Sequence, residues 1–230
     1  MRSIGDNLQA VLQRIANAAV AAGRDPGGVT LLAVSKTHPP ALIEQAYAAG
    51  QRAFGENYVQ EAVEKMDALA GRNIEWHLVG ALQSNKTRVV AERFDWVHSI
   101  ESEKIARRLS AQRPAGKSPL NVLIQVNVSG EASKSGVAPD AVADLAQSVA
   151  SLPNLRLRGL MAVPEPTSDS TLQRSRFRQL RKILEKISGN PETLSMGMSD
   201  DLEAAIAEGA TLVRVGTAIF GRRQRIRPAA

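Results

Sequence analysis

Short apolar stretches alternate with amphipathic stretches along the chain, and the alternation occurs eight times. The clearest apolar stretch, VTLLAVS, is an almost unbroken run of β-prone residues, which is typical of a strand covered on both faces. The pattern predicts strands over residues 29–35, 52–55, 74–80, 95–100, 120–129, 155–163, 193–197 and 211–221. The stretches between them carry apolar residues at helical spacing. In a chain of 230 residues, eight such units predict an α/β fold, a single closed (β/α)8 barrel of the TIM type.

An extra amphipathic helix is predicted before the first strand. Residues 3–22 carry apolar side chains at helical spacing, and Gly23 with Pro26 ends the run. An open, doubly wound sheet is the alternative architecture. It would normally need a glycine-rich phosphate turn after the first strand, and SKTHPP stands there instead. We therefore expect one barrel domain over residues 1–230, in which residues 222–230 form a basic tail.

The charge of the chain raises the question of nucleic-acid binding. The net charge is +6, and the sequence ends in RRQRIRPAA, whose four arginines supply most of it. Without that tail the chain is only mildly basic, and aromatic residues make up only 3%. Because stacking aromatics and a basic surface are what nucleic acids bind, we expect no nucleic-acid partner and interpret the tail as a solvated end.

Cysteine is absent from the chain, which excludes disulfides, thiolate metal sites and a cysteine nucleophile. The absence also fits a reducing compartment. No stretch approaches 18 uncharged apolar residues, and the amino end does not have the pattern of a signal peptide. These observations predict a cytoplasmic protein with no membrane partner.

Lys36 follows the first predicted strand directly, so its amine should emerge at the carboxyl end of the barrel, where such folds carry their active sites. Burial lowers the pKa of a lysine and frees the amine to attack a carbonyl group, as in Schiff-base lysines. A structural role is the competing interpretation. In that case Lys36 reaches solvent or pairs with a carboxylate such as Glu56. The position of Lys36, taken without any other residue, favours this structural role.

Two segments near the end of the chain predict a phosphate site. SMGMSDD places Ser199 at the start of a predicted helix, and VRVGT places Gly216 and Thr217 after the eighth strand. Loops after the seventh and eighth strands form the usual phosphate site of such barrels. Helix capping by Asp200 and Glu203 would equally explain the first segment. Arg214 points either into the barrel mouth or towards an acidic neighbour.

A lysine beside a phosphate site fits pyridoxal 5'-phosphate and also a sugar-phosphate aldolase. Several strings decide between them by resemblance: LLAVSKTHP, FGENYVQE, WHLVG with LQSNK, HSI, QVNVSGEASKSG, GLMAV, LSMGMSDDLEAAI and VRVGTAIFG. Together, and in this order over residues 4–221, they resemble the YggS/PROSC family, also called pyridoxal phosphate homeostasis proteins. Each string alone is weak, but the combination is highly specific.

The resemblance implies a fold-type III barrel, related to the N-terminal domain of alanine racemase, that binds pyridoxal 5'-phosphate. Lys36 would form the internal aldimine, and Arg214 would face the pyridine nitrogen. The phosphate group would be held by Ser199, Gly216 and Thr217. Asn57 of GENY and Met161 of GLMAV would line the ring site, although packing is a serious rival role for the methionine.

An arginine at the pyridine nitrogen disfavours protonation of the ring, which makes the cofactor a poorer electron sink. Racemisation needs an acid–base group on each face of the cofactor, and Lys36 serves only one face. In alanine racemase a tyrosine of a second domain serves the other face. This chain offers Tyr47, within a predicted helix, and Tyr58, near the predicted mouth without any sign of a base role.

We therefore expect a protein without catalytic activity, a monomer that stores or delivers the cofactor, with apo forms of pyridoxal phosphate enzymes as candidate acceptors. The alternative is a racemase or lyase that acts on a small amino acid through the same lysine. A metal hydrolase is a third class, since His38, His77 and His98 all follow predicted strands. No two histidines have the spacing of a ligand pair on one element, so we predict no metal site.

Overall fold

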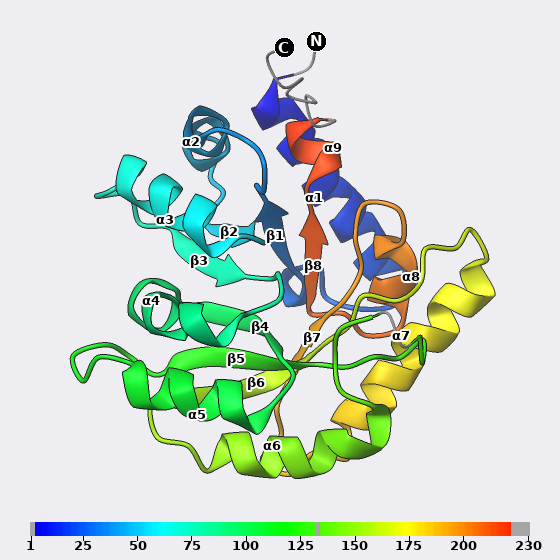
Figure 1. Ribbon diagram of the computed structural model, residues 1–230. Coiled ribbons are helices and arrows are strands. Elements are labelled where there is room, and N and C mark those ends of the chain that lie inside the picture. Colours follow the sequence, from blue (N-terminus) through cyan, green and yellow to red (C-terminus); the bar gives the residue numbers. More distant parts are fainter. Residues whose placement is uncertain (1–2, 132–133, 222–230) are drawn as a thin grey trace, which may run out of the picture.

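Eight parallel strands form a closed barrel in the computed structural model, which describes residues 3–131 and 134–221 (Figure 1). Each strand pairs with the next along the chain, and the eighth closes the ring against the first. The strands are β1 (Thr30–Val34), β2 (Ala53–Glu56), β3 (Glu75–Leu78), β4 (Trp96–Ile100), β5 (Leu120–Gln125), β6 (Leu155–Met161), β7 (Thr193–Ser195) and β8 (Leu212–Val215). The predicted α/β barrel is confirmed.

Helices surround the barrel, as Figure 1 shows. Leu32, Phe54 and Leu78, from three neighbouring strands, are fully buried. The helices are α1 (Ile4–Ala21), α2 (Pro40–Ala48), α3 (Val59–Ala68), α4 (Thr87–Arg93), α5 (Glu103–Gln112), α6 (Val142–Ala150), α7 (Ser170–Leu184), α8 (Leu202–Ala207) and α9 (Thr217–Phe220). No helix within the described ranges is long and apolar enough to cross a membrane. The basic tail, residues 222–230, lies outside the described residues.

The predicted leading helix is confirmed as α1, and its ends follow from the sequence. Ser3 and Asp6 form a reciprocal capping box, with both hydrogen bonds at 3.0 Å, which satisfies amide groups that the first turn would leave unpaired. The buried face of α1 carries Leu8, Val11, Ile15 and Ala19. This face packs against α8 and α9, so the extra helix supports the segments that follow the last two strands.

The eighth strand is shorter than predicted. The apolar run continues to residue 221, but the strand ends at Val215 and residues 217–220 form α9. Periodicity cannot distinguish a strand from a helix in so short an apolar run. Gly216 makes the change of direction, and a Cβ atom there would lie 2.9 Å from the carbonyl oxygen of Val34. The turn therefore brings α9 directly beside the end of β1.

Candidate functional site

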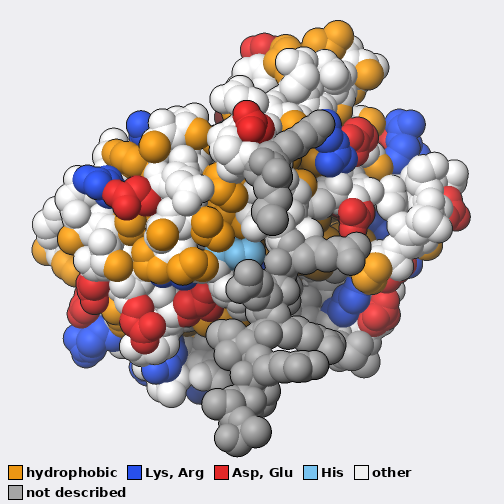
Figure 2. Space-filling model, turned by 90° about the horizontal axis from the view of Figure 1, so that it is seen from above, with side chains coloured by type: hydrophobic (Ala, Val, Ile, Leu, Met, Phe, Trp, Pro, Cys, Tyr) orange, Lys and Arg blue, Asp and Glu red, His pale blue; other side chains and the backbone are white. Residues whose placement is uncertain are grey.

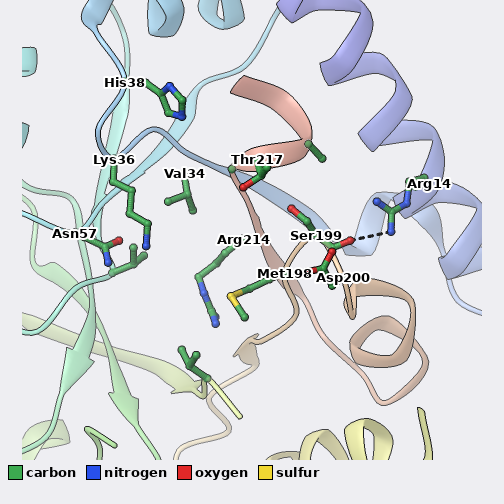
Figure 3. A pocket seen from close by; sticks show the side chains of 14 residues that line it. Arg14, Val34, Lys36, His38, Asn57, Met198, Ser199, Asp200, Arg214 and Thr217 are labelled. Carbon is green, nitrogen blue, oxygen red and sulfur yellow. Dashed lines mark hydrogen bonds between the residues drawn. The ribbon is translucent and has the colours of Figure 1, made fainter. Parts of the chain in front are cut away.

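A cavity of about 660 Å³ opens at the carboxyl ends of the strands. Figure 2 views the molecule from this end, where hydrophobic side chains gather beside a histidine near the middle and charged side chains lie towards the edge. Six of the seven predicted site residues line the cavity: Lys36, Asn57, Ser199, Arg214, Gly216 and Thr217. They come from β1, β2, β7, β8 and the segments that follow them, and Figure 3 shows how they face one another.

Met161, the seventh predicted residue, is not among the side chains that line this cavity. It ends β6, is 1% exposed and pairs in register with Ser195 of β7. Packing inside the barrel was the rival interpretation for this residue, and its surroundings fit that role. Asn57 is half-buried at the cavity wall. Its backbone packs closely against Gly80: a Cβ atom on residue 80 would lie 2.2 Å from the Asn57 carbonyl oxygen.

The turn that carries Lys36 is held from both sides. Before the lysine, the Ser35 amide donates to the Gly55 carbonyl at 2.9 Å, and the Ser35 hydroxyl donates to Glu56 at 2.6 Å. After it, the amide of Thr37 donates to Glu61 Oε1 at 2.5 Å. Thr37 has a φ of 65°, an uncommon left-handed conformation for a residue other than glycine. Such strain persists only where surrounding contacts enforce it, and the Glu61 contact does so here.

A buried ammonium group joins these contacts into one network. Lys65 Nζ donates to Glu56 Oε1 at 2.7 Å, to Glu61 Oε1 at 2.6 Å and to the Ser35 carbonyl at 2.8 Å, which uses all three of its N–H groups. The side chains of Lys65 and Glu56 are 4% and 0% exposed. Burial raises the pKa of Glu56, and the charge of Lys65 opposes that rise. Glu56 thus binds Lys65 and Ser35 in place of the suggested pairing with Lys36.

Arg214 is buried on the inner side of the cavity and points into it (Figure 3). Its Nη1 donates to the carbonyl oxygen and the hydroxyl of Ser195, at 2.6 and 2.8 Å, and its Nη2 donates to the Ala162 carbonyl at 2.9 Å. Burial lowers the pKa of Arg214 to about 10, and the charge of Asp201 opposes the shift. The guanidinium group therefore stays cationic near neutral pH and is held by neutral oxygen atoms.

Ser199 and Thr217 face each other across one end of the cavity, with Arg14 of α1 beside them (Figure 3). Arg14 Nη2 donates to the Ser199 carbonyl at 3.1 Å, and its guanidinium group also binds Glu203. Glu203 binds Arg14, and the residue that precedes α8 makes no side-chain capping hydrogen bond, so the capping box suggested for Asp200 and Glu203 is wrong. Asp201 is the residue before α8, and its carboxylate accepts from the Met198 amide at 2.6 Å.

Of the remaining chemical candidates, only His38 lines this cavity. Tyr47 in α2 stacks under Arg52, and Tyr58 is 59% exposed; neither tyrosine lines the cavity. His38 does line the cavity, and its ring centre lies 5.3 Å from that of Phe220. His77 and His98 are buried inside the barrel and bind each other. Over residues 3–131 and 134–221 no group of three or more His, Cys, Asp or Glu side chains could hold a metal ion.

The sequence did not identify Arg14 or Lys65 as residues of this site. Both lie on helices, where a basic residue is normally a solvated surface group. Only the packing of α1 against α8, and of α3 against β2, brings them to the cavity and to the Lys36 turn. The capping signal of α1 and its apolar face located the helix, but nothing local to Arg14 indicated a partner 185 residues away.

Residues 7–224 match the family described as "Alanine racemase, N-terminal domain". A protein of Pseudomonas aeruginosa named "Pyridoxal phosphate homeostasis protein" is 59% identical over 229 residues and the match covers 100% of both chains. PipY of Synechococcus elongatus, in a structure with pyridoxal phosphate bound, is 38% identical with a TM-score of 0.83, and the match covers 95% of this chain and all of that one.

A more distant likeness concerns the fold alone. Alanine racemase of Bartonella henselae is 15% identical with a TM-score of 0.71. The match covers 98% of this chain but only 61% of that enzyme. The barrel described above therefore corresponds to one part of the larger enzyme.

Replacing Lys65 with methionine tests the network beneath the Lys36 turn. The change leaves Glu56 buried without its cation, so we expect the free energy of unfolding to fall by about 3–5 kcal/mol in urea titrations. Arg93→Met is the matched control, because the Arg93–Asp67 pair is exposed; its loss should be less than about 1 kcal/mol. Equal losses in the two variants would show that the buried network does not stabilise this part of the barrel.

Proposed function

This chain belongs to the pyridoxal phosphate homeostasis protein family, which has the fold of the alanine racemase N-terminal domain, and from that premise we propose that it stores pyridoxal 5'-phosphate for other enzymes. Lys36 is the residue that binds the cofactor covalently. The observation that carries the proposal is the meeting of three unlike groups in one cavity: the Lys36 amine, the Arg214 cation, and the hydroxyls of Ser199 and Thr217.

The residues of the cavity fit the three reactive parts of the cofactor. Its phosphate group suits the hydroxyls of Ser199 and Thr217 and the positive charge of Arg14. Its aldehyde suits the amine of Lys36, and its pyridine nitrogen suits the N–H groups of Arg214. A cavity of about 660 Å³ is within the usual range for a small-molecule site.

When bound, the cofactor supplies an aldehyde that condenses with an amine and releases water, and a ring that withdraws electrons. Arg214 limits the second property. Its pKa of about 10 keeps the guanidinium group protonated near neutral pH, so Arg214 would donate a hydrogen bond to the pyridine nitrogen without transferring a proton to it, and the bound cofactor would withdraw electrons less strongly. This supports storage of the cofactor over its use in amino-acid chemistry.

Acid–base groups at the cavity support the same proposal. Racemisation needs a proton donor and acceptor on both faces of the cofactor, and neither Tyr47 nor Tyr58 lines the cavity. His38 lines it and is the residue on which a racemase or lyase activity would depend. That activity is the second candidate function, and the likeness to racemase folds is what favours it.

The proposal extends to partners and location. We expect the protein to act as a monomer in the cytoplasm and to give up its cofactor to apo forms of pyridoxal phosphate enzymes. A reversible covalent bond suits this task, because an incoming amine can displace Lys36 without free aldehyde being released.

Reduction with borohydride tests the covalent bond. Protein loaded with pyridoxal phosphate should show a visible absorption band that borohydride removes, and peptide mass spectrometry should then find the cofactor on Lys36. The amine of Lys36 lines the cavity, which is why we expect this lysine to react. In Lys36→Ala the band should be lost while the unfolding transition is retained. Cofactor fixed to another lysine in the unmodified chain would refute the assignment.

Replacement of the hydroxyls tests the phosphate site. Ser199→Ala and Thr217→Val should each raise the dissociation constant of pyridoxal phosphate by about 10- to 100-fold, since each removes one hydrogen bond to a charged group. The rate at which loaded protein activates an apo-enzyme should rise in the same variants. Ser151→Ala, at an exposed serine outside the cavity, is the control and should change neither quantity. If Thr217→Val lowers the stability of the protein while the folded fraction binds pyridoxal phosphate with unchanged affinity, the Thr217 hydroxyl has a structural role instead.

A further inference from the structure

Five polar side chains form a continuous row of hydrogen bonds through the inside of the barrel. Arg214 Nη1 donates to Ser195 Oγ at 2.8 Å, and Ser195 Oγ lies 2.9 Å from His98 Nδ1. His98 Nε2 lies 2.9 Å from His77 Nδ1, and His77 Nε2 lies 2.8 Å from Glu75 Oε1. We call this row the barrel relay. It begins at the cofactor cavity and ends at the first residue of β3, where the Glu75 side chain is 49% exposed.

When both imidazoles are neutral, the two ends of the barrel relay fix the direction of every hydrogen bond in it. Arginine can only donate, and an ionised carboxylate can only accept. Ser195 therefore accepts from Arg214 and donates its hydroxyl proton to His98 Nδ1. His98 then carries its proton on Nε2 and donates to His77 Nδ1, and His77 donates from Nε2 to Glu75. Each imidazole in this arrangement is neutral, and its tautomer is assigned from the roles of the neighbouring atoms.

The opposite direction is unfavourable. It would need an extra proton on His77 or on Glu75, and it would leave the Ser195 hydroxyl proton without an acceptor in the row. Burial lowers the pKa of His77 and, more strongly, the pKa of His98, so an added proton is disfavoured on either ring. The hydrogen bond from His77 lowers the pKa of Glu75, which favours the ionised carboxylate at the outer end.

Arg214 needs this row because its charge is buried without a carboxylate at hydrogen-bond distance. Across residues 3–131 and 134–221 the acceptors of its guanidinium group are the Ala162 carbonyl and two oxygen atoms of Ser195. Each member of the barrel relay turns the negative end of its dipole towards Arg214. The negative charge of Glu75 lies at the far end and keeps the dipoles aligned. Aligned dipoles in a region of low dielectric strengthen one another and stabilise a buried cation.

We propose that the barrel relay positions Arg214 for the cofactor: it stabilises the guanidinium cation and fixes the orientation of the N–H groups that face the cavity. His98 and His77 are positioning residues that act through Ser195 and do not touch the cofactor. The inference rests on the proposed function, because the orientation of Arg214 matters there through the pyridine nitrogen. It adds a link between the cofactor and a carboxylate at the opposite, solvent-exposed end of the barrel.

Other groups face the barrel relay and determine which variants are informative. The Trp96 ring stacks on His77, with ring centres 5.3 Å apart and an interplanar angle of 7°, and Arg158 lies over the Trp96 ring at 5.6 Å from its centre. Asp95 acts on His77 and Asp201 acts on Arg214 through their charges. Glu75→Gln is the mildest test, since glutamine retains an acceptor for His77 and removes only the charge.

The direction of the barrel relay can be measured without cofactor. Long-range ¹H–¹⁵N NMR resolves the tautomers of the three histidines, and His77→Gln and His98→Asn spectra assign them. Between about pH 5.5 and pH 8, we expect His77 and His98 to stay neutral with the proton on Nε2. A proton on Nδ1 of His98, or titration of either ring near the ordinary histidine pKa, would refute the proposed direction.

The effect on the cofactor is measured with loaded protein. Glu75→Gln should raise the dissociation constant of pyridoxal phosphate about threefold, and His98→Asn, which cuts the row beyond Ser195, about tenfold. Both variants should shift the pH at which the visible band changes. Glu64→Gln, which removes an exposed carboxylate on α3, is the matched control and should change neither.

These outcomes separate the two proposals. If the unmodified chain does not bind pyridoxal phosphate, the proposed function fails, whereas the histidine tautomers still test the barrel relay. If the chain binds, and both variants lose only thermal stability with unchanged affinity and spectrum, the row is structural and the positioning role is wrong. Glu75 is half exposed, so its conservative replacement should leave the barrel folded and the test readable.

Discussion

Ionised side chains inside a closed barrel have little access to water, and this constraint organises the site. A buried charge is tolerated only where protein groups replace the lost solvent. The barrel meets this need twice. Lys65 and Glu56 bind each other beneath the Lys36 turn, and the carbonyl and hydroxyl of Ser195 hold Arg214. Both arrangements leave little freedom to the groups around them, so the turn that carries Lys36 and the guanidinium group of Arg214 are held in fixed positions.

The chemistry follows from where the fixed groups lie. An amine on a firmly held turn and a permanent cation suit the retention of pyridoxal phosphate, and under the proposed function the same cation would weaken the ring as an electron sink. The likeness to alanine racemase covers only 61% of that enzyme, so the folds agree over the barrel alone. An enzyme would need acid–base groups at the cavity, and the described side chains that line it include His38.

Much of this could be predicted from the sequence, because strands and their ends are local features. The apolar runs predicted eight strands, and positions at the strand ends predicted five of the residues that line the cavity, while the family resemblance added Asn57. Residues on distant elements could not be predicted in this way. Arg14 reaches the cavity only because α1 packs against α8, and Lys65 reaches Ser35 only because α3 covers β2. The end of β8 was missed because a short apolar run fits a strand and a helix equally well.

The central claim is that this cavity holds pyridoxal phosphate without using it to transform amino acids. Incubation of loaded protein with a panel of amino acids in deuterated buffer tests it most directly, with exchange of the Cα hydrogen followed by NMR. We expect exchange no faster than with free pyridoxal phosphate at the same concentration, in the unmodified chain and in Lys36→Ala alike. Exchange well above that background, lost in Lys36→Ala and reduced in His38→Ala, would contradict the claim and establish an enzyme.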